Sequence, residues 1–339
     1  MKPKLIIIIA VLFFVVLSAF VLEENPYFKI TIKDVVFKIP KGFPKPFYDL
    51  SKNKPSVEGF TLGRKLFYDP ILSADYFTSC ATCHQQFAAF AHIDHPLSHG
   101  IGGRLGIRNV PSLQNLIWKD AFMADGAINH LDLQPLAPIT SVSEMGENLP
   151  NVIKKLQANS TYKRMFYKAF QDSTITTEML MKSLSQFLSL MISCNSRYDK
   201  FIAGVDTFTS IEEKGLNLFK SNCVTCHPPP LFTDNNYYNI GLKPDSNLND
   251  NGRMTITSFK EDYFKFKTPS LRNVEMTYPY MHDGRYRNLK EVMNHYAASQ
   301  SCSNKKFDDS EKTELIAFLK TLTDMDYLHD RRFADPNTY

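Results

Sequence analysis

Two short motifs carry the most specific chemistry in this chain, Cys80-Ala-Thr-Cys83-His84 and Cys223-Val-Thr-Cys226-His227. In a Cys-x-x-Cys-His motif the two thiols reach the vinyl groups of one haem, and the histidine ligates its iron. With six Cys and nine His in 339 residues, chance placement gives only about 0.003 such motifs per chain. Four thiols on one zinc ion are the alternative, and the histidine directly after each pair disfavours it. The motifs therefore predict two covalently bound haem c groups.

The segments around the two motifs recur in the same order, which predicts a duplicated unit. Gly63 to Phe67 precedes the first motif, and Gly215 to Phe219 precedes the second. Later in each half a Pro-Ser-Leu segment is followed by an Asp-Gly pair. The spacing is 14 residues from Pro111 to Asp125 and again 14 residues from Pro269 to Asp283.

The duplicated register suggests what lies on the second face of each haem iron. A ligand on that face favours electron transfer, and an open face allows catalysis. Tyr296 lies 14 residues after His282, and Pro138 lies 14 residues after the counterpart Ala124. A tyrosine oxygen can ligate iron and proline cannot, so we expect one capped iron and one open iron. Met293 competes with Tyr296 as the capping ligand, and a hydrogen-bonded core tyrosine is the alternative role for Tyr296.

A proline-rich segment near the expected open iron carries Gln134 and Glu144. Cleaving peroxide requires a base that moves a proton from one oxygen to the other, and a carboxylate beside an amide suits that task. From the sequence alone, both are also ordinary polar loop residues.

Periodicity predicts a mostly α fold, with apolar residues at helical spacing in several stretches. We expect helices at 152–170, 177–191, 210–220, 289–297 and 310–322. A linker is expected near residues 203–210. Two long loops, 89–110 and 228–267, each follow a haem motif, where irregular chain is needed to wrap a porphyrin.

The first 24 residues are predicted to be an export signal or a retained membrane anchor. Lys2 and Lys4 precede an apolar run from Leu5 to Leu22, which is broken only by Ser18. The body is therefore expected outside the cytoplasm, in the periplasm or a similar compartment. There, Cys194 and Cys302 could form a disulfide or remain two buried thiols. The formal charge of +4 includes the two leader lysines, so the rest of the chain is close to neutral. Nucleic acid is therefore not expected as a partner.

Taken together, these motifs resemble the bacterial dihaem cytochrome c peroxidase family, which includes the methylamine-dehydrogenase maturase. The similarity runs from about Val57 to Leu322 and includes the segments Leu62 to Pro70, Arg108 to Ser112, Glu144 to Gly146 and Lys267 to Val274. It implies two cytochrome c-like helical domains. We expect the peroxidatic haem domain at residues 45–205 and the electron-transfer haem domain at residues 206–330.

The resemblance also implies roles for particular residues. The haem on His84 would be the peroxidatic one, and the haem on His227 would transfer electrons. Gln134 and Glu144 match the family's catalytic pair above the open iron. Asn109, Thr277 and Pro279 match the residues around a calcium ion, which favours oxygen ligands.

Three positions depart from the usual family pattern. Tyr296 replaces the methionine of typical peroxidases and matches the maturase. Ile101 stands where many members have a histidine that closes the resting peroxidatic iron, which favours a permanently open iron here. His92, His95 and His99 lie close enough to substitute for it and are interpreted as surface loop histidines. Ala124 replaces a tryptophan between the haems, so Phe122, Met123 or direct haem contact would have to carry the electron.

The leading functional hypothesis is a peroxidase that reduces hydrogen peroxide to water. Its electrons would come from a small cytochrome c or copper protein, and a homodimer is possible. The first alternative is a maturase-like enzyme that uses peroxide-oxidised haem to oxidise a side chain of a partner protein. The second is an electron carrier or peroxide sensor without catalysis.

Overall fold

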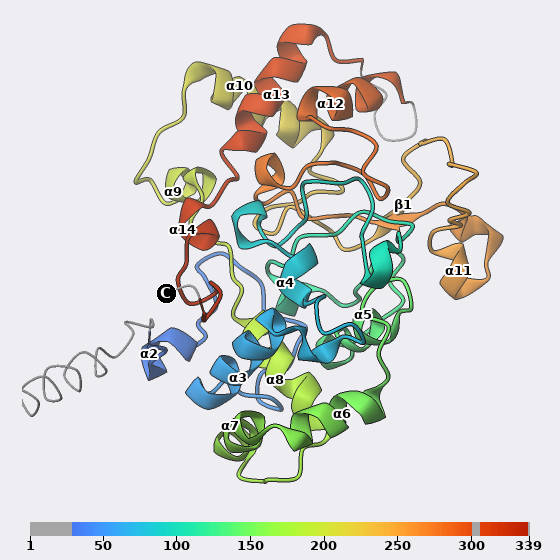
Figure 1. Cartoon of the computed structure of the whole chain (residues 1–339). Coiled ribbons are helices and arrows are strands. Elements are labelled where there is room, and N and C mark those ends of the chain that lie inside the picture. The colour runs from blue at the N-terminus through green and yellow to red at the C-terminus, as the bar shows by residue number, and fades with distance from the viewer. Residues whose placement is uncertain (1–28, 300–305, 338–339) are drawn as a thin grey trace, which may run out of the picture.

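The computed structural model describes residues 29–299 and 306–337, and within them the chain is mostly helical (Figure 1). The predicted mostly α fold is therefore confirmed. Long irregular segments connect the helices and fill the middle of the molecule. The expected leader lies outside the described residues. Among the residues that are described, no helix is both long and apolar enough to cross a membrane.

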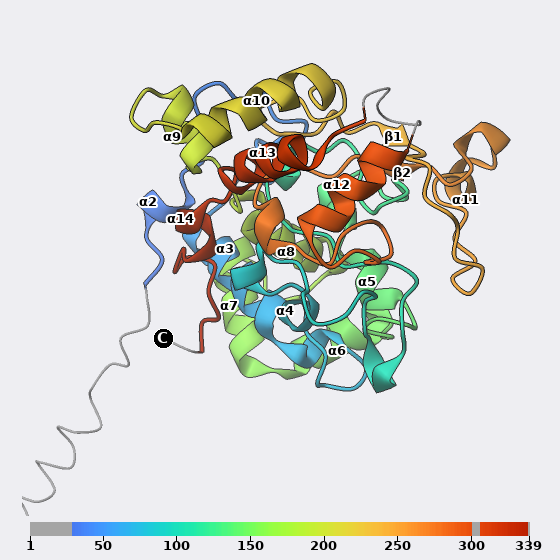
Figure 2. The ribbon, with the colours of Figure 1, turned by 90° about the horizontal axis from the view of Figure 1, so that it is seen from above.

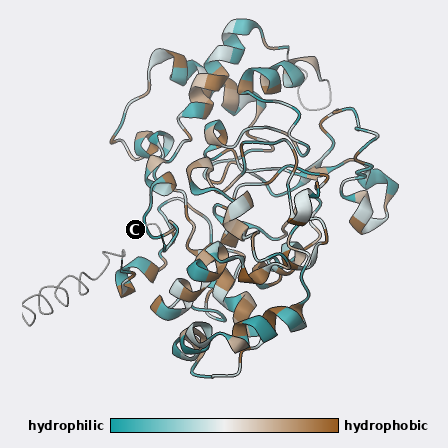
Figure 3. Ribbon diagram, viewed as in Figure 1, coloured by the Kyte–Doolittle hydropathy of each residue, from teal (hydrophilic) through white to brown (hydrophobic). Residues whose placement is uncertain are grey.

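The first part of the chain builds one hydrophobic core around the contact between α3 and α8. Hydrophobic residues gather where these two helices meet (Figure 3). Gly63 of α3 permits the close approach, because a Cβ atom there would overlap the carbonyl oxygen of Ser183 on α8. The helices of this part are α2 (Ile32–Val35), α3 (Val57–Tyr68), α4 (Cys80–Cys83), α5 (Leu136–Thr140), α6 (Leu149–Ala158), α7 (Ser160–Phe170) and α8 (Thr177–Ser189).

A second core forms around the contact between α10 and α13. Gly215 of α10 packs against α13 in the same way, since a Cβ atom there would overlap the carbonyl oxygen of Glu314. The rings of Phe219 and Phe318 pack nearby at an interplanar angle of 46°, with centroids 4.9 Å apart. The helices of this part are α9 (Arg197–Ile202), α10 (Ser210–Asn222), α11 (Met254–Thr257), α12 (Leu289–Ala298) and α13 (Asp309–Lys320). The last helix, α14 (Met325–Leu328), packs into the first core instead.

The predicted helices are confirmed with one correction. The stretch expected as a single helix over 152–170 is two helices, α6 and α7, separated at Asn159. The Asn159 side chain accepts hydrogen bonds from the backbone N–H groups of Thr161 and Tyr162 and so caps α7. Asparagine is a favoured N-cap residue. A new helix therefore begins at Ser160, although the spacing of apolar residues continues across Asn159.

β-structure is slight. Strands β1 (Tyr237–Tyr238) and β2 (Phe266–Lys267) form an antiparallel pair beside α12 (Figure 2). Two isolated bridges, Phe122 with Ile128 and Tyr280 with Tyr286, close two similar turns around the Asp-Gly pairs.

The C-terminal segment returns to the first core, which the sequence does not predict. Figure 1 shows this segment beside α2 and α3. The Arg64 side chain donates to the carbonyl oxygen of Ala334 over 2.6 Å, and the Tyr68 hydroxyl donates to that of Phe333 over 2.6 Å. Tyr327 and Phe333 are buried in the first core. Residues 327–334 therefore pack against α3 and the first core.

Candidate haem sites and the residues around them

The first Cys-x-x-Cys-His motif forms the short helix α4 and the residue that follows it. The N–H of His84 donates to the carbonyl oxygen of Cys80 over 2.9 Å, which turns the imidazole out of the helix. Nδ1 of His84 lies 2.7 Å from the carbonyl oxygen of Phe90. Because a carbonyl can only accept, Nδ1 carries the proton in this contact and Nε2 keeps a free lone pair.

The second motif has the same geometry. The N–H of His227 donates to the carbonyl oxygen of Cys223 over 2.9 Å. Nδ1 of His227 lies 3.0 Å from the carbonyl oxygen of Phe232. Phe90 and Phe232 both have left-handed backbone conformations, with φ of 59° and 55°, which aim their carbonyl groups back at the imidazoles.

These side chains fit two attached haems. Burial lowers the pKa of His84 to about 4 and also lowers the pKa of His227, so both imidazoles are neutral, the form that ligates iron. Cys80 packs against the first core and Cys223 against the second. Each motif therefore offers two thiols and one correctly oriented imidazole nitrogen.

Glu144 lies close to the first motif. The pKa of the Cys80 thiol is raised to about 12 by burial, by Cys83 and in part by the negative charge of Glu144. Burial and the same charge raise the pKa of Cys83. Burial raises the pKa of Glu144 itself. Within the described residues its carboxylate has no hydrogen-bond or ion-pair partner, so a carboxyl group that can change protonation state stands beside the first haem site.

Gln134 comes from the same folded segment. It ends a 3₁₀ turn immediately before α5, and the chain after α5 folds back onto that helix through the N–H of Met145, which donates to the carbonyl oxygen of Pro138 over 3.1 Å. The α5 segment thus carries both predicted residues. A direct contact between them is not among the described hydrogen bonds, so the role of Gln134 remains a prediction.

Ile101 lies beside Glu144. Its N–H donates to the carbonyl oxygen of Glu144 over 2.7 Å. A Cβ atom at Gly146 would overlap the Ile101 side chain, and one at Gly100 would overlap the carbonyl oxygen of Ser143. The residue predicted to leave the iron open is therefore packed firmly next to the expected acid-base group.

Both candidate ligands for the second iron lie on α12. Met293 is buried, and Tyr296 is partly buried against the second core that also contains Cys223. The structure therefore brings Tyr296, Met293 and the second motif to the same core. Which of the two side chains ligates iron remains a prediction.

The predicted calcium residues lie near one another. The N–H of Asn109 donates to the carbonyl oxygen of His282 over 2.7 Å, three residues after Pro279. Thr277 and Pro279 precede that turn on the same strand of chain. Within the described residues, no three His, Cys, Asp or Glu side chains are grouped as a metal site, so calcium here would depend on amide and carbonyl oxygens.

Two reciprocal hydrogen bonds join the halves. The N–H of Asn109 in the first half donates to His282 in the second, and the N–H of Lys267 in the second donates to the carbonyl oxygen of Ala124 in the first, each over 2.7 Å. In the predicted register Asn109 corresponds to Lys267, and Ala124 corresponds to His282. In each direction, the residue two positions before the Pro-Ser-Leu segment of one half therefore contacts the turn before the Asp-Gly pair of the other half.

An ion cluster that the sequence did not predict reinforces this contact. Arg108 donates two hydrogen bonds to Asp250, over 2.7 and 2.8 Å, and one to Asp125, over 2.6 Å. Arg108 and Asp125 belong to the repeated segments, so their importance could have been suspected. Asp250 stands in a long loop with no recognisable pattern.

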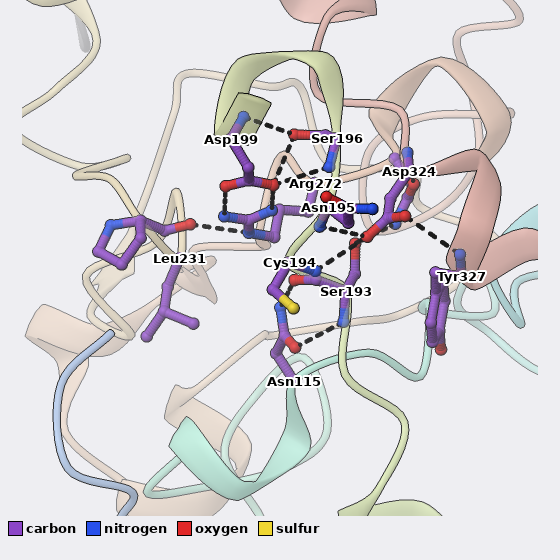
Figure 4. Close-up of polar contacts among 12 residues, drawn as sticks. Asn115, Ser193, Cys194, Asn195, Ser196, Asp199, Leu231, Arg272, Asp324 and Tyr327 are labelled. Carbon is purple, nitrogen blue, oxygen red and sulfur yellow. Dashed lines mark hydrogen bonds and ion pairs between the residues drawn. The ribbon is translucent and has the colours of Figure 1, made fainter. Parts of the chain in front are cut away.

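A second polar cluster holds the segment between the halves (Figure 4). The fully buried Arg272 makes two hydrogen bonds of 2.8 Å to Asp199. Buried Asp324 accepts from the Ser193 hydroxyl over 3.0 Å and from the N–H groups of Cys194 and Asn195 over 2.8 and 2.9 Å. Cys302 lies outside the described residues, so its pairing with Cys194 remains a prediction.

Comparison with known proteins identifies the class. A model of the di-haem cytochrome c peroxidase family matches residues 57–207. The methylamine utilization protein MauG of Methylophilus methylotrophus is 33% identical over 299 residues, which cover 84% of this chain and 87% of that protein. The chain belongs to the di-haem cytochrome c peroxidase family. It is an oxidoreductase of the class that acts on peroxide.

Other relatives span the branches of the family. The cytochrome c551 peroxidase of Nitrosomonas europaea is 33% identical, with 77% of this chain and 79% of that protein covered. The crystal structure of a MauG-like protein associated with microbial copper homeostasis superimposes with a TM-score of 0.80 at 31% identity, covering 89% of this chain and 99% of that one. The similarity extends to peroxidases and to MauG alike.

Proposed function

We propose that this enzyme reduces hydrogen peroxide to water with electrons from a small external cytochrome c or copper protein. Each turnover consumes one peroxide, two electrons and two protons and yields two waters. The observation that carries the proposal is the half-buried carboxylate of Glu144, which has no hydrogen-bond or ion-pair partner within the described residues, beside Cys80 and Cys83. The relatives of this chain that are named cytochrome c551 peroxidases support the same reaction.

The chain's own residues would divide the work as follows. Bound haem supplies the redox chemistry at both motifs. Glu144 accepts a proton from one peroxide oxygen and returns it to the other, which becomes the leaving water. The Gln134 amide hydrogen-bonds the peroxide and orients it. The second motif, capped through α12, passes electrons to the first.

Replacing Glu144 with Gln tests this role. The substitution keeps the shape of the side chain and removes the acid-base function, so peroxide turnover should fall roughly 100-fold or more. The matched control is Glu178→Gln, the same change on an exposed face of α8. Turnover with a reduced small cytochrome is measured on both variants. Unchanged turnover in Glu144→Gln rejects the role.

A maturase-like activity is the second candidate, and Tyr296 favours it. In this function, peroxide oxidises both haem sites and the enzyme then oxidises a side chain of a partner protein, as the relationship to MauG suggests. The two functions differ in how they use electrons. Rapid peroxide-dependent oxidation of a reduced small cytochrome supports the peroxidase. A long-lived oxidised state with little turnover supports the maturase-like enzyme.

The proposal includes two cytochrome c-like domains, at residues 45–205 and 206–330, related by internal duplication. Matching hydrogen bonds support it: the N–H of Asn115 donates to the carbonyl oxygen of Met191, and the N–H of Asn273 donates to that of Leu322, over 2.9 and 3.0 Å. Both asparagines are left-handed, with φ of 54° and 58°. In each half the same turn is thus fixed to the chain that follows the last core helix.

Calcium, location and assembly complete the proposal. A calcium ion would be held by Asn109, Thr277 and Pro279 through amide and carbonyl oxygens. The enzyme would act in the periplasm, either released or anchored through residues 1–24, and could be a homodimer. Chelation followed by measurement of calcium content and of inter-haem electron transfer tests the calcium site.

A further inference from the structure

The rings of three histidines in the loop after the first motif lie next to one another in one column. The ring centroids of His92 and His95 are 4.8 Å apart at an angle of 44°, and those of His95 and His99 are 4.2 Å apart at 19°. We call His92, His95 and His99 the histidine column. The rings lie one beside the next rather than being turned toward a common point, which does not suit chelation of a metal ion. They form a cluster of three titratable side chains, each of which can exchange a proton with water.

The column runs from the interior to solvent. His92 is buried, with 8% of its surface exposed, and its Nδ1 has no hydrogen-bond partner within the described residues. His95 is half-buried and His99 is exposed. The nearest carboxylate is that of Asp94, 3.9 Å from Nε2 of His92. The column therefore begins at a buried imidazole with an unsatisfied nitrogen and ends at an exposed one.

The column lies along the first haem motif. The sulfur of Cys83 is 3.4 Å from the carbonyl oxygen of His99, and His92 is near enough to His84 for a positive charge on it to act on that ring. The loop is fixed in place: the N–H of Ser98 donates to the carbonyl oxygen of Arg108 over 3.0 Å. A Cβ atom at Gly284 would overlap the carbonyl oxygen of Pro96, so this turn packs tightly against the loop.

The second motif has nothing comparable. Between His227 and His282 the sequence contains no histidine at all. The column thus accompanies only the motif that lies beside Glu144, the one at which the proposed reaction consumes protons.

We propose that the histidine column is a redox-linked proton acceptor of the first haem site. When one electron enters the iron held by His84, the column takes up one proton from solvent, which compensates the added negative charge. When the electron leaves, the proton is released. The inference depends on haem attachment at Cys80, Cys83 and His84 and extends the proposed function, because peroxide reduction needs two protons at this site.

The charges around the column define the direction of the effect. Burial and repulsion from His95 lower the pKa of His92, and the same two causes lower the pKa of His99. Asp94 acts in the opposite sense on His92. From the second half, Lys243, Asp245, Asp283 and Arg285 line the groove beside Pro96 and Leu97. The lowered pKa values of His92 and His99 favour their neutral forms with oxidised iron, and the column gains its proton when the iron is reduced, so the reduction potential rises as pH falls.

The test is a spectroelectrochemical titration of both haems in the full holoprotein, without peroxide, between about pH 5 and pH 8. In the unmodified protein the first haem's potential should fall with rising pH, by up to about 59 mV per pH unit for one proton per electron. His92→Gln should remove most of this slope and leave the second haem unchanged. His130→Gln, an exposed histidine of the first half outside the column, is the control.

His95→Gln provides a second variant if His92→Gln fails to load haem, because it breaks the column in the middle. A slope that persists in whichever of these variants load haem overturns the inference, as does an equal loss at both haems. The measurement involves no peroxide turnover. A protein inactive toward peroxide that still loses its slope in His92→Gln would reject the proposed function and support the column.

Discussion

The two halves of this protein repeat several local backbone features and differ in the side chains around them. In both, a histidine donates through Nδ1 to the carbonyl oxygen of a left-handed phenylalanine, at 2.7 Å in the first half and 3.0 Å in the second. In both, a glycine lets two core helices touch. The common features orient an iron ligand. They do not decide what the iron does.

The carboxylates beside the motifs show the difference most clearly. Burial raises the pKa of Glu144, which has no partner to oppose it. Asp234, near Cys226, is also partly buried, but hydrogen bonds from Tyr238 and Asn236 outweigh burial and lower its pKa. Asp234 therefore stays ionised, whereas Glu144 can exchange a proton. The carboxylates beside the two motifs therefore differ in how readily they take up a proton.

The largest expected effect is on the contact between the halves. Asp324→Ala removes the acceptor of three hydrogen bonds from residues 193–195. Leaving buried donors unsatisfied should lower the free energy of unfolding by about 3 kcal/mol. Denaturant unfolding followed by haem absorbance measures it. Asp326→Ala, two residues away and exposed, should cost less than about 0.5 kcal/mol; equal costs would contradict this role for Asp324.

The capping ligand of the second iron is the next largest effect. Because a phenolate stabilises ferric iron, Tyr296→Phe should raise the reduction potential of the second haem by on the order of 100 mV, about 2.3 kcal/mol. Met293→Leu, three residues away on the same helix, should leave it unchanged. Redox titration with visible spectra distinguishes the two. A fall in potential in Met293→Leu would assign the ligand to methionine instead.

A smaller and equal effect is expected at the two glycines. Gly63→Ala and Gly215→Ala each place a methyl group against a carbonyl oxygen of the facing helix, which should cost about 2 kcal/mol in each case. Hydrogen exchange should show local opening of α3 and α8 in the first variant, and of α10 and α13 in the second. Opening of all four helices in both variants would show that the cores unfold together.

Much of this architecture could be predicted from the sequence because it is local or repeated. The two haem motifs, the amphipathic helices and the matching turns all appear in the sequence as residue types at regular or repeated spacings. The break at Asn159 was missed because the apolar period continues across it. The pairs of Arg108 with Asp250 and of Arg272 with Asp199 join distant segments, so no spacing predicts them. The spacing of apolar residues likewise does not predict that Tyr327 and Phe333 pack into the first core.

The smallest effect concerns pH and follows from the burial of Glu144. Its raised pKa means that the carboxyl becomes protonated, and unable to accept a proton from peroxide, at a higher pH than an exposed glutamate near 4.3. Peroxide turnover should therefore fall about tenfold for each pH unit below that raised pKa, with the column's own effect on potential separated by the titration above. The profile of kcat/KM against pH measures it in the unmodified enzyme and in Glu144→Gln. The decline in kcat/KM at low pH should be absent from the residual activity of Glu144→Gln. A decline in kcat/KM at the same pH in both proteins would assign the titration to another group. Glu144 would then no longer distinguish the first motif from the second.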